Sequence, residues 1–170
     1  MTLLVTAASK HGATLEIAEA IARVLAEQGV SAELVPIDEV SNLGRYDAVV
    51  LGSAVYMGKW LEPARTFIER HGNALAERKT WLFSSGPIVG DPPRPDPADE
   101  AAGQRALESA HAREHRLFAG KLDKSKLGLL EKTAVRAAHA SEGDFRDWGE
   151  INRWAAEIAA QVKAEAYEGS

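Results

Sequence analysis

Near the start of the chain, the stretch ASKHGAT places two hydroxyl side chains and a glycine at the spacing Ser9-x-x-Gly12-x-Thr14. It lies between a short apolar run and a helical pattern, so it is expected to form the turn into a first helix. Backbone N–H groups and the positive end of the helix dipole attract anions at such a turn. Ser9 and Thr14 could donate to phosphate oxygens, Lys10 could add charge, and Gly12 permits the positive φ of an anion-binding nest. The alternative is that Ser9 or Thr14 only caps the helix.

A second candidate site is the glycine-flanked stretch GSAVYMGKW, from Gly52 to Trp60. The phosphate loop of an ATPase has four residues between its glycines and a Ser or Thr after its lysine, to bind magnesium. Here five residues separate Gly52 from Gly58, and no such hydroxyl follows. Aromatic and thioether side chains, here Tyr56 and Met57, instead suit stacking against a flat apolar ligand. For Trp60 the alternative is packing against the helix that comes next.

Side chains for other chemistry are absent or dispersed. The chain has no cysteine, which excludes disulfides, thiol catalysis and iron–sulfur ligation. A phosphate-accepting receiver domain needs carboxylates at the ends of the first and third apolar runs, and the sequence has none there. His71, His111, His115 and His139 are dispersed and expected on the surface. No catalytic acid or base and no metal site is predicted, so any redox chemistry would require an organic cofactor.

The elements that would position these stretches alternate between strand and helix patterns. Pro63 suits the first turn of a helix, and Asp147 with Glu150 has capping-box spacing at the start of the last one. A proline in the second apolar run favours an edge position for that strand. The predicted strands are 2–7, 31–37, 46–53, 80–86 and 115–122, and the predicted helices are 13–29, 63–79 and a long one from 147.

Such alternation predicts an α/β fold, a doubly wound parallel sheet of five strands with helices on both faces. Ligands bind there beyond the carboxyl ends of the strands, where the strand order reverses. The loops 8–14, 53–60 and 85–100 are therefore the candidate ligand loops. The stretch 86–100 holds five of the seven prolines and is predicted to be one long loop.

Composition limits the class of protein. The 170 residues, 45% hydrophobic and 26% charged, suit a single domain over 1–170. A net charge of −5 argues against nucleic acid as a partner. The sequence has no 18-residue apolar run and no signal-peptide pattern, so we expect a cytoplasmic protein without a membrane span.

These stretches resemble the flavodoxin family. TAASKHGATLEIAEAIA is similar to its phosphate loop and first helix, and DAVVLGSAVYMGKW to its third strand and flavin loop. The resemblance is closer to the flavodoxin-like menaquinone-dependent protoporphyrinogen IX dehydrogenases, through Gly52, Ser53, Tyr56 and Gly58, FAG at 118–120 and the pair Asp147-Trp148. It spans most of the chain and implies the strand order 2-1-3-4-5 with FMN at the switch point.

The resemblance implies that Ser9, His11, Gly12 and Thr14 hold the FMN phosphate. For His11 the alternative is an exposed spacer. The flavin ring would lie between 53–60 and the loop that opens at Ser85 and Gly86. The implied cofactor-binding residues are Ser9, Lys10, His11, Gly12, Ala13, Thr14, Ser53, Ala54, Val55, Tyr56, Met57, Gly58, Trp60, Ser85, Gly86 and Pro87.

In those dehydrogenases an inserted basic, apolar segment is thought to meet the membrane. The corresponding segment here, 121–138, keeps basic residues but is much less apolar. Leu127, Leu130 and Ala134 share one helical stripe, so a surface helix with a core-facing stripe is expected, and peripheral membrane contact is the alternative.

The resulting hypothesis is an FMN-dependent oxidoreductase, similar to the protoporphyrinogen dehydrogenases. A flavodoxin-type electron carrier and a non-catalytic binding module on the same fold are the alternatives. The redox partner or substrate is not predicted, and a homodimer is left open.

Overall fold

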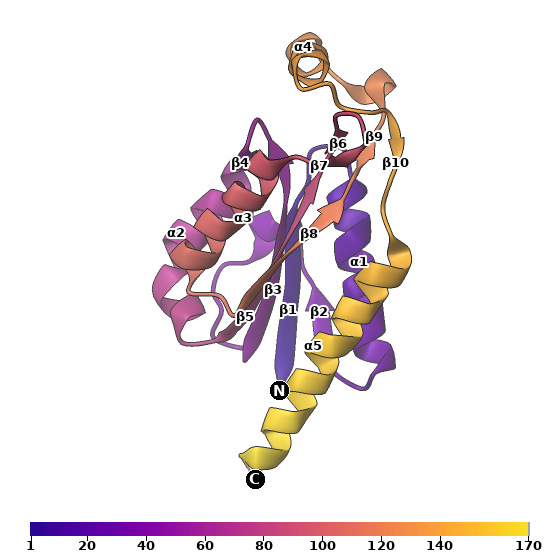
Figure 1. The fold of residues 1–170 in the computed structure, drawn as a ribbon. Helices are drawn as coiled ribbons and strands as arrows, with labels where there is room; N and C mark the ends of the chain where they lie inside the picture. The colour runs from indigo at the N-terminus through magenta and orange to yellow at the C-terminus, as the bar shows by residue number, and fades with distance from the viewer. Residues whose placement is uncertain (170) are drawn as a thin grey trace.

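Five parallel strands form the central sheet of the computed structural model, which describes residues 1–169; Ser170, the last residue of the predicted domain, lies outside the described residues. The strand order is β2-β1-β3-β5-β8, which confirms the predicted 2-1-3-4-5 arrangement (Figure 1). β2 lies at the edge, as its proline-containing sequence predicted, and is shorter than expected. The strands are β1 Thr2–Ala8, β2 Ser31–Leu34, β3 Ala48–Tyr56, β5 Lys79–Gly86 and β8 Glu114–Ala119.

Helices cover both faces of this sheet. In Figure 1, α1 and α5 lie on one face and α2 and α3 on the other. The first face packs around Phe83, Phe118 and Trp154, whose rings meet edge-on or tilted with centroids 5.6–6.2 Å apart. Asp147 caps α5 by accepting a hydrogen bond from Glu150 N, 3.0 Å, as its spacing predicted. The helices are α1 Ala13–Glu27, α2 Glu62–Ala76, α3 Pro97–Ala110 and α5 Trp148–Glu168, and a 3₁₀ turn spans Ile37–Glu39.

Strand register brings the candidate ligand loops to one edge of the sheet. Ala8 of β1 pairs with Ser53 of β3, and Ala54 of β3 pairs with Ser85 of β5. Gly86, the last residue of β5, pairs with Ala119 of β8. Carboxyl ends of parallel strands emerge together, so segments that are far apart in sequence meet at this edge.

The prediction of a loop over 53–60 was wrong. β3 continues to Tyr56 and turns back as β4, Lys59–Trp60, which pairs antiparallel with it. Met57 and Gly58 form the turn with φ values of 49° and 69°. Two consecutive positive φ values match the twist of a two-residue hairpin, and the β-branched and aromatic residues on either side extend the strand.

The stretch 86–100 is not one long loop either. β6 Ile88–Val89 and β7 Arg94–Pro95 form a small hairpin, and helix α3 then begins at Pro97. This helix was missed, although Asp96 and Pro97 carry a start signal. Asp96 Oδ1 accepts from Ala98 N, 2.9 Å, and proline is favoured in the first helical turn.

The predicted fifth strand is interrupted at Gly120, after which the chain leaves the sheet and passes over the carboxyl ends of the strands (Figure 1). This excursion, residues 120–147, contains β9 Lys121–Leu122, a 3₁₀ turn Lys124–Lys126, α4 Leu129–Ala137 and β10 Gly143–Asp144, which pairs with β9. The helix expected in 121–138 is present, but its predicted core-facing stripe is wrong. None of the described residues of α4 is buried, and Leu130 is 83% exposed. Within residues 1–169 no helix has both the length and the apolar composition to cross a membrane.

Candidate functional site

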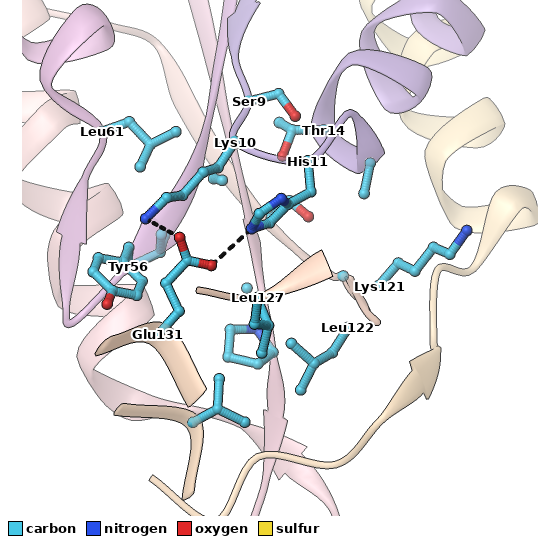
Figure 2. Close-up of a pocket in the computed structure, with 18 residues that line it drawn as sticks. Ser9, Lys10, His11, Thr14, Tyr56, Leu61, Lys121, Leu122, Leu127 and Glu131 are labelled. Atoms are coloured by element: carbon cyan, nitrogen blue, oxygen red, sulfur yellow. Dashed lines mark hydrogen bonds and ion pairs between the residues drawn. The ribbon is translucent and has the colours of Figure 1, made fainter. Parts of the chain in front are cut away.

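A cavity lies where the carboxyl ends of β1, β3 and β5 meet the excursion (Figure 2). The turn before α1 and the end of β3 supply one side, and β5 and the excursion supply the other. Its lining residues are Ser9, Lys10, His11, Ala13, Thr14, Ala54, Val55, Tyr56, Leu61, Ser85, Gly86, Pro87, Gly120, Lys121, Leu122, Leu127, Glu131 and Val135.

The turn into α1 has the geometry of an anion site. Gly12 is the N-cap residue with φ 90°, a left-handed conformation that favours glycine. Ser9 Oγ accepts from Gly12 N at 3.0 Å, which folds the turn back on itself. Glycine has no side chain that could cap the helix, and in the part of the chain that the structure describes no side-chain hydrogen bond caps the start of α1. Those N–H groups and the helix dipole therefore remain suited to an anion such as phosphate.

Two donors from the same turn reach across the cavity to α4. Lys10 Nζ lies 2.5 Å from Glu131 Oε1, and His11 Nε2 lies 2.8 Å from Glu131 Oε2 (Figure 2). The hydrogen bonds from Lys10 and then His11 lower the pKa of Glu131, although partial burial opposes them. Lys10 also sits 4.3 Å from the ring centroid of Tyr56, in a cation–π contact. His11 is therefore exposed, as the alternative held, but it is not a free spacer, because its ring nitrogen contacts Glu131.

The rest of the cavity is largely apolar. Val55 lies in the β3–β4 hairpin and Leu61 directly after it, whereas Leu122, Leu127 and Val135 come from the excursion. Together with the ring of Tyr56 they border a space suited to a flat aromatic ligand, because such ligands gain from apolar contact and stacking. The cavity thus joins an anion-binding turn to an apolar slot.

A buried acid lies behind one wall of this cavity. Asp99, in the first turn of α3, is 3% exposed, and its Oδ2 has no hydrogen-bond partner among the described residues. A Cβ atom on Gly86 would overlap with that oxygen, so the carboxyl group occupies the space that a side chain at 86 would need. Burial, and then the nearby Asp96, raise the pKa of Asp99 to about 7.

The structure brings most of the predicted residues together, but not all. Ser9, Lys10, His11, Ala13, Thr14, Ala54, Val55, Tyr56, Ser85, Gly86 and Pro87 line the cavity, and Gly12 shapes its turn through the backbone. The others do not line it: Ser53 is buried, Met57 is 75% exposed at the turn tip, and Gly58 follows it in the same turn.

Trp60, which the resemblance implies as a cofactor-binding residue, does not line the cavity. The side chain is 3% exposed, and its Nε1 donates to Ser84 Oγ at 2.8 Å in the packing below the hairpin. Trp60 belongs to the buried cluster that α2 and α3 form with their face of the sheet, and not to the cavity lining. The alternative weighed from the sequence, packing against the following helix, is the one observed.

Sequence reasoning missed the residues that the excursion and the start of α2 contribute. These are Leu61, Gly120, Lys121, Leu122, Leu127, Glu131 and Val135.

The expectation that four histidines lie on the surface was also wrong for two of them. His71 is buried, and the side chain of His115 is 3% exposed, with Nε2 2.8 Å from Ser84 Oγ.

Comparison with known proteins gives a matching family and a relative of similar length. The family model described as Flavodoxin domain matches residues 4–148. Protoporphyrinogen IX dehydrogenase (quinone) of Escherichia coli strain K12 is 22% identical over 172 aligned residues, which cover 94% of this chain and 95% of that protein.

Solved flavodoxins share the fold. A flavodoxin from the domain Archaea superposes with a TM-score of 0.63 at 19% identity and covers 96% of this chain and 99% of its own. Flavodoxin 1 from Bacillus cereus gives a TM-score of 0.62 at 17% identity, with 94% and 98% covered. At these identities the likeness concerns the fold.

Proposed function

Because this chain belongs to the flavodoxin domain family, we propose that it is an FMN-dependent oxidoreductase with its cofactor in the cavity at the carboxyl ends of β1, β3 and β5. The observation that carries the proposal is the joining of a glycine-capped helix start to an apolar, tyrosine-bordered slot. Phosphate and isoalloxazine are the two ends of FMN, and each matches one end of this cavity.

The residues would share the work of holding FMN. The first-turn amides of α1, with the hydroxyls of Ser9 and Thr14, would bind the phosphate group. Tyr56 and the apolar side chains around it would border the ring, and Ser85 and Gly86 would bring backbone close to it. When bound, FMN supplies the capacity to accept and return electrons; the chain supplies binding, orientation and the electrostatic environment.

The relationship to the dehydrogenase favours an enzyme over an electron carrier. That relative, named for oxidation of protoporphyrinogen IX with a quinone, aligns over nearly its whole length with this chain. We therefore propose oxidation of a small organic substrate, with a porphyrinogen as the first compound to test. An electron carrier would instead take up its electrons in two well-separated one-electron steps. A single two-electron step in an anaerobic redox titration would support the enzyme.

The test of the cofactor site compares two glycines with the same conformation. Gly12 and Gly29, at opposite ends of α1, have φ values of 90° and 79°, and a Cβ on either meets nothing within 4 Å. Gly12→Val and Gly29→Val should each lower the free energy of unfolding by about 1–2 kcal/mol, because both place a side chain on a left-handed backbone. Only Gly12→Val should abolish FMN uptake, measured by calorimetry and by the absorption spectrum. Equal FMN affinity in the two variants would refute the phosphate-loop assignment, and a wild-type protein without flavin uptake would refute the function.

A further inference from the structure

Helix α4 is attached to the body of the protein through the cavity rather than through the core. None of its described residues is buried, and Leu129 and Leu130 are each 83% exposed. Its inward side carries Glu131 and Val135, both in the cavity lining. Glu131 makes the charged contacts of that side, and its side chain is 14% exposed.

The two partners of Glu131 both come from the turn that is built for an anion. Lys10 and His11 directly precede Gly12 in sequence, and both direct a nitrogen to the same carboxylate, one to each oxygen (Figure 2). Two donors that each bind one oxygen of a carboxylate can also bind the oxygens of another anion. A phosphate group offers more negative charge and three acceptor oxygens, so it would compete for the same two donors.

We infer that Glu131 is an internal competitor for an anion subsite formed by Lys10 and His11, and that a ligand phosphate displaces it and releases α4 from the turn. The inference rests on the proposed function, because FMN is the phosphate ligand that the cavity would take. It adds a coupling: cofactor binding and the position of α4 become linked through one shared pair of donors.

The remaining attachments of the excursion indicate which part would move. Arg146, whose side chain is 4% exposed, pairs with Asp144 and Glu16 and so ties the end of the excursion to α1. On the other side, Ser141 N donates to Ile88 O at 2.9 Å, next to the bridge between Val89 and Ala140. The chain after α4 is therefore fixed independently of Glu131, and loss of the Glu131 contacts would free the helix itself.

The experiment compares Glu131→Gln with Glu142→Gln. Glu142 is an exposed carboxylate of the same excursion that accepts from Lys124 N, and it does not line the cavity. Affinities are measured for FMN and for riboflavin, which lacks the phosphate. Removing the competing charge should raise the affinity of Glu131→Gln for FMN about tenfold, the scale of one hydrogen bond to a charged group. Riboflavin affinity should stay as in the wild type, and Glu142→Gln should change neither.

A ratio of FMN to riboflavin affinity that is unchanged or lower in Glu131→Gln would overturn the inference, because a purely structural contact would affect both ligands alike. In wild-type protein, FMN should also speed amide hydrogen exchange in 129–137, and slower exchange there would count against release. Inorganic phosphate keeps the inference testable if no flavin binds. It should raise the melting temperature of Glu131→Gln more than that of wild type, and equal shifts would overturn the inference independently of the proposed function.

Discussion

Replacing Asp99 by asparagine removes a buried titrating group without changing its shape. The carboxyl group lies against Gly86 and is 3% exposed, and asparagine fills the same space without a charge. Because burial disfavours the charged form, the folded protein holds the Asp99 proton more tightly than the unfolded chain does. The pKa is raised from 3.8 to about 7.

The sign and size of the effect follow from this difference. Stabilisation from protonated Asp99 is complete below about pH 4 and is lost as the pH rises to about 7. Three pKa units at 1.36 kcal/mol each correspond to about 4 kcal/mol in the free energy of unfolding. Roughly 3 kcal/mol of that loss falls between pH 5 and pH 8. The Asp99→Asn variant has no such proton and should lack this loss.

The assay is urea unfolding at several values between pH 5 and pH 8, followed by circular dichroism, for wild type, Asp99→Asn and Glu108→Gln. Glu108 is an exposed residue of the same helix α3, so its replacement controls for loss of a charge on that helix. The difference in unfolding free energy between Asp99→Asn and wild type should grow with pH in favour of the variant. Parallel profiles would mean that Asp99 stays ionised throughout, and the reasoning from its burial would be refuted.

Three further substitutions separate binding from stability. Tyr56→Ala should weaken FMN binding about tenfold by removing the contact between the tyrosine ring and the flavin, while the urea midpoint of unfolding changes little. An unchanged FMN affinity would show that Tyr56 does not contact the cofactor. Trp60→Phe should do the reverse, because loss of the hydrogen bond to Ser84 Oγ costs about 1–2 kcal/mol of stability, and a large loss of FMN affinity would restore Trp60 as a ligand contact. Arg146→Gln should lower the unfolding free energy by about 1–3 kcal/mol, since Asp144 and Glu16 lose their partner. If Arg146→Gln lowers the unfolding free energy equally in a variant in which Asp144 and Glu16 are both replaced by their amides, the ion pairs are not the cause.

The sheet was predictable because its sequence signals are local. The runs that became β1, β3 and β5 are almost continuously apolar, as expected for strands covered on both faces, and the structure buries nearly all of them. The turn at Gly12 was equally readable, because only a few residue types tolerate its φ of 90°. Where a strand pattern, a turn residue and a helix pattern come one after another, each limits where the neighbouring elements can begin and end.

The part of the cavity that comes from the excursion could not be read in this way. The ion pairs of Glu131 join it to Lys10 and His11, at the other end of the sequence, and no periodicity in the α4 sequence distinguishes a cavity-facing acid from a solvated one. The stripe Leu127, Leu130 and Ala134 misled for the same reason. Its spacing is helical, but the helix begins only at Leu129, and the surface it faces is set by chain segments far away in sequence.

The cover over the cavity also bears on the kind of redox partner. A carrier that passes electrons to another protein must bring its cofactor close to that protein's surface, and a strong field helps to steer the two together. Here Leu127 and Val135 lie across the cavity, and the net charge of −5 is modest. A narrow apolar space admits a small molecule more readily than a protein surface, which supports the proposed small-molecule oxidoreductase for as long as α4 stays over the cavity. Because release of α4 on FMN binding would open the cavity, electron transfer from the FMN-loaded protein to a protein acceptor and to a small quinone should be compared directly. Faster transfer to the quinone would support the enzyme, and faster transfer to the protein acceptor would support the carrier.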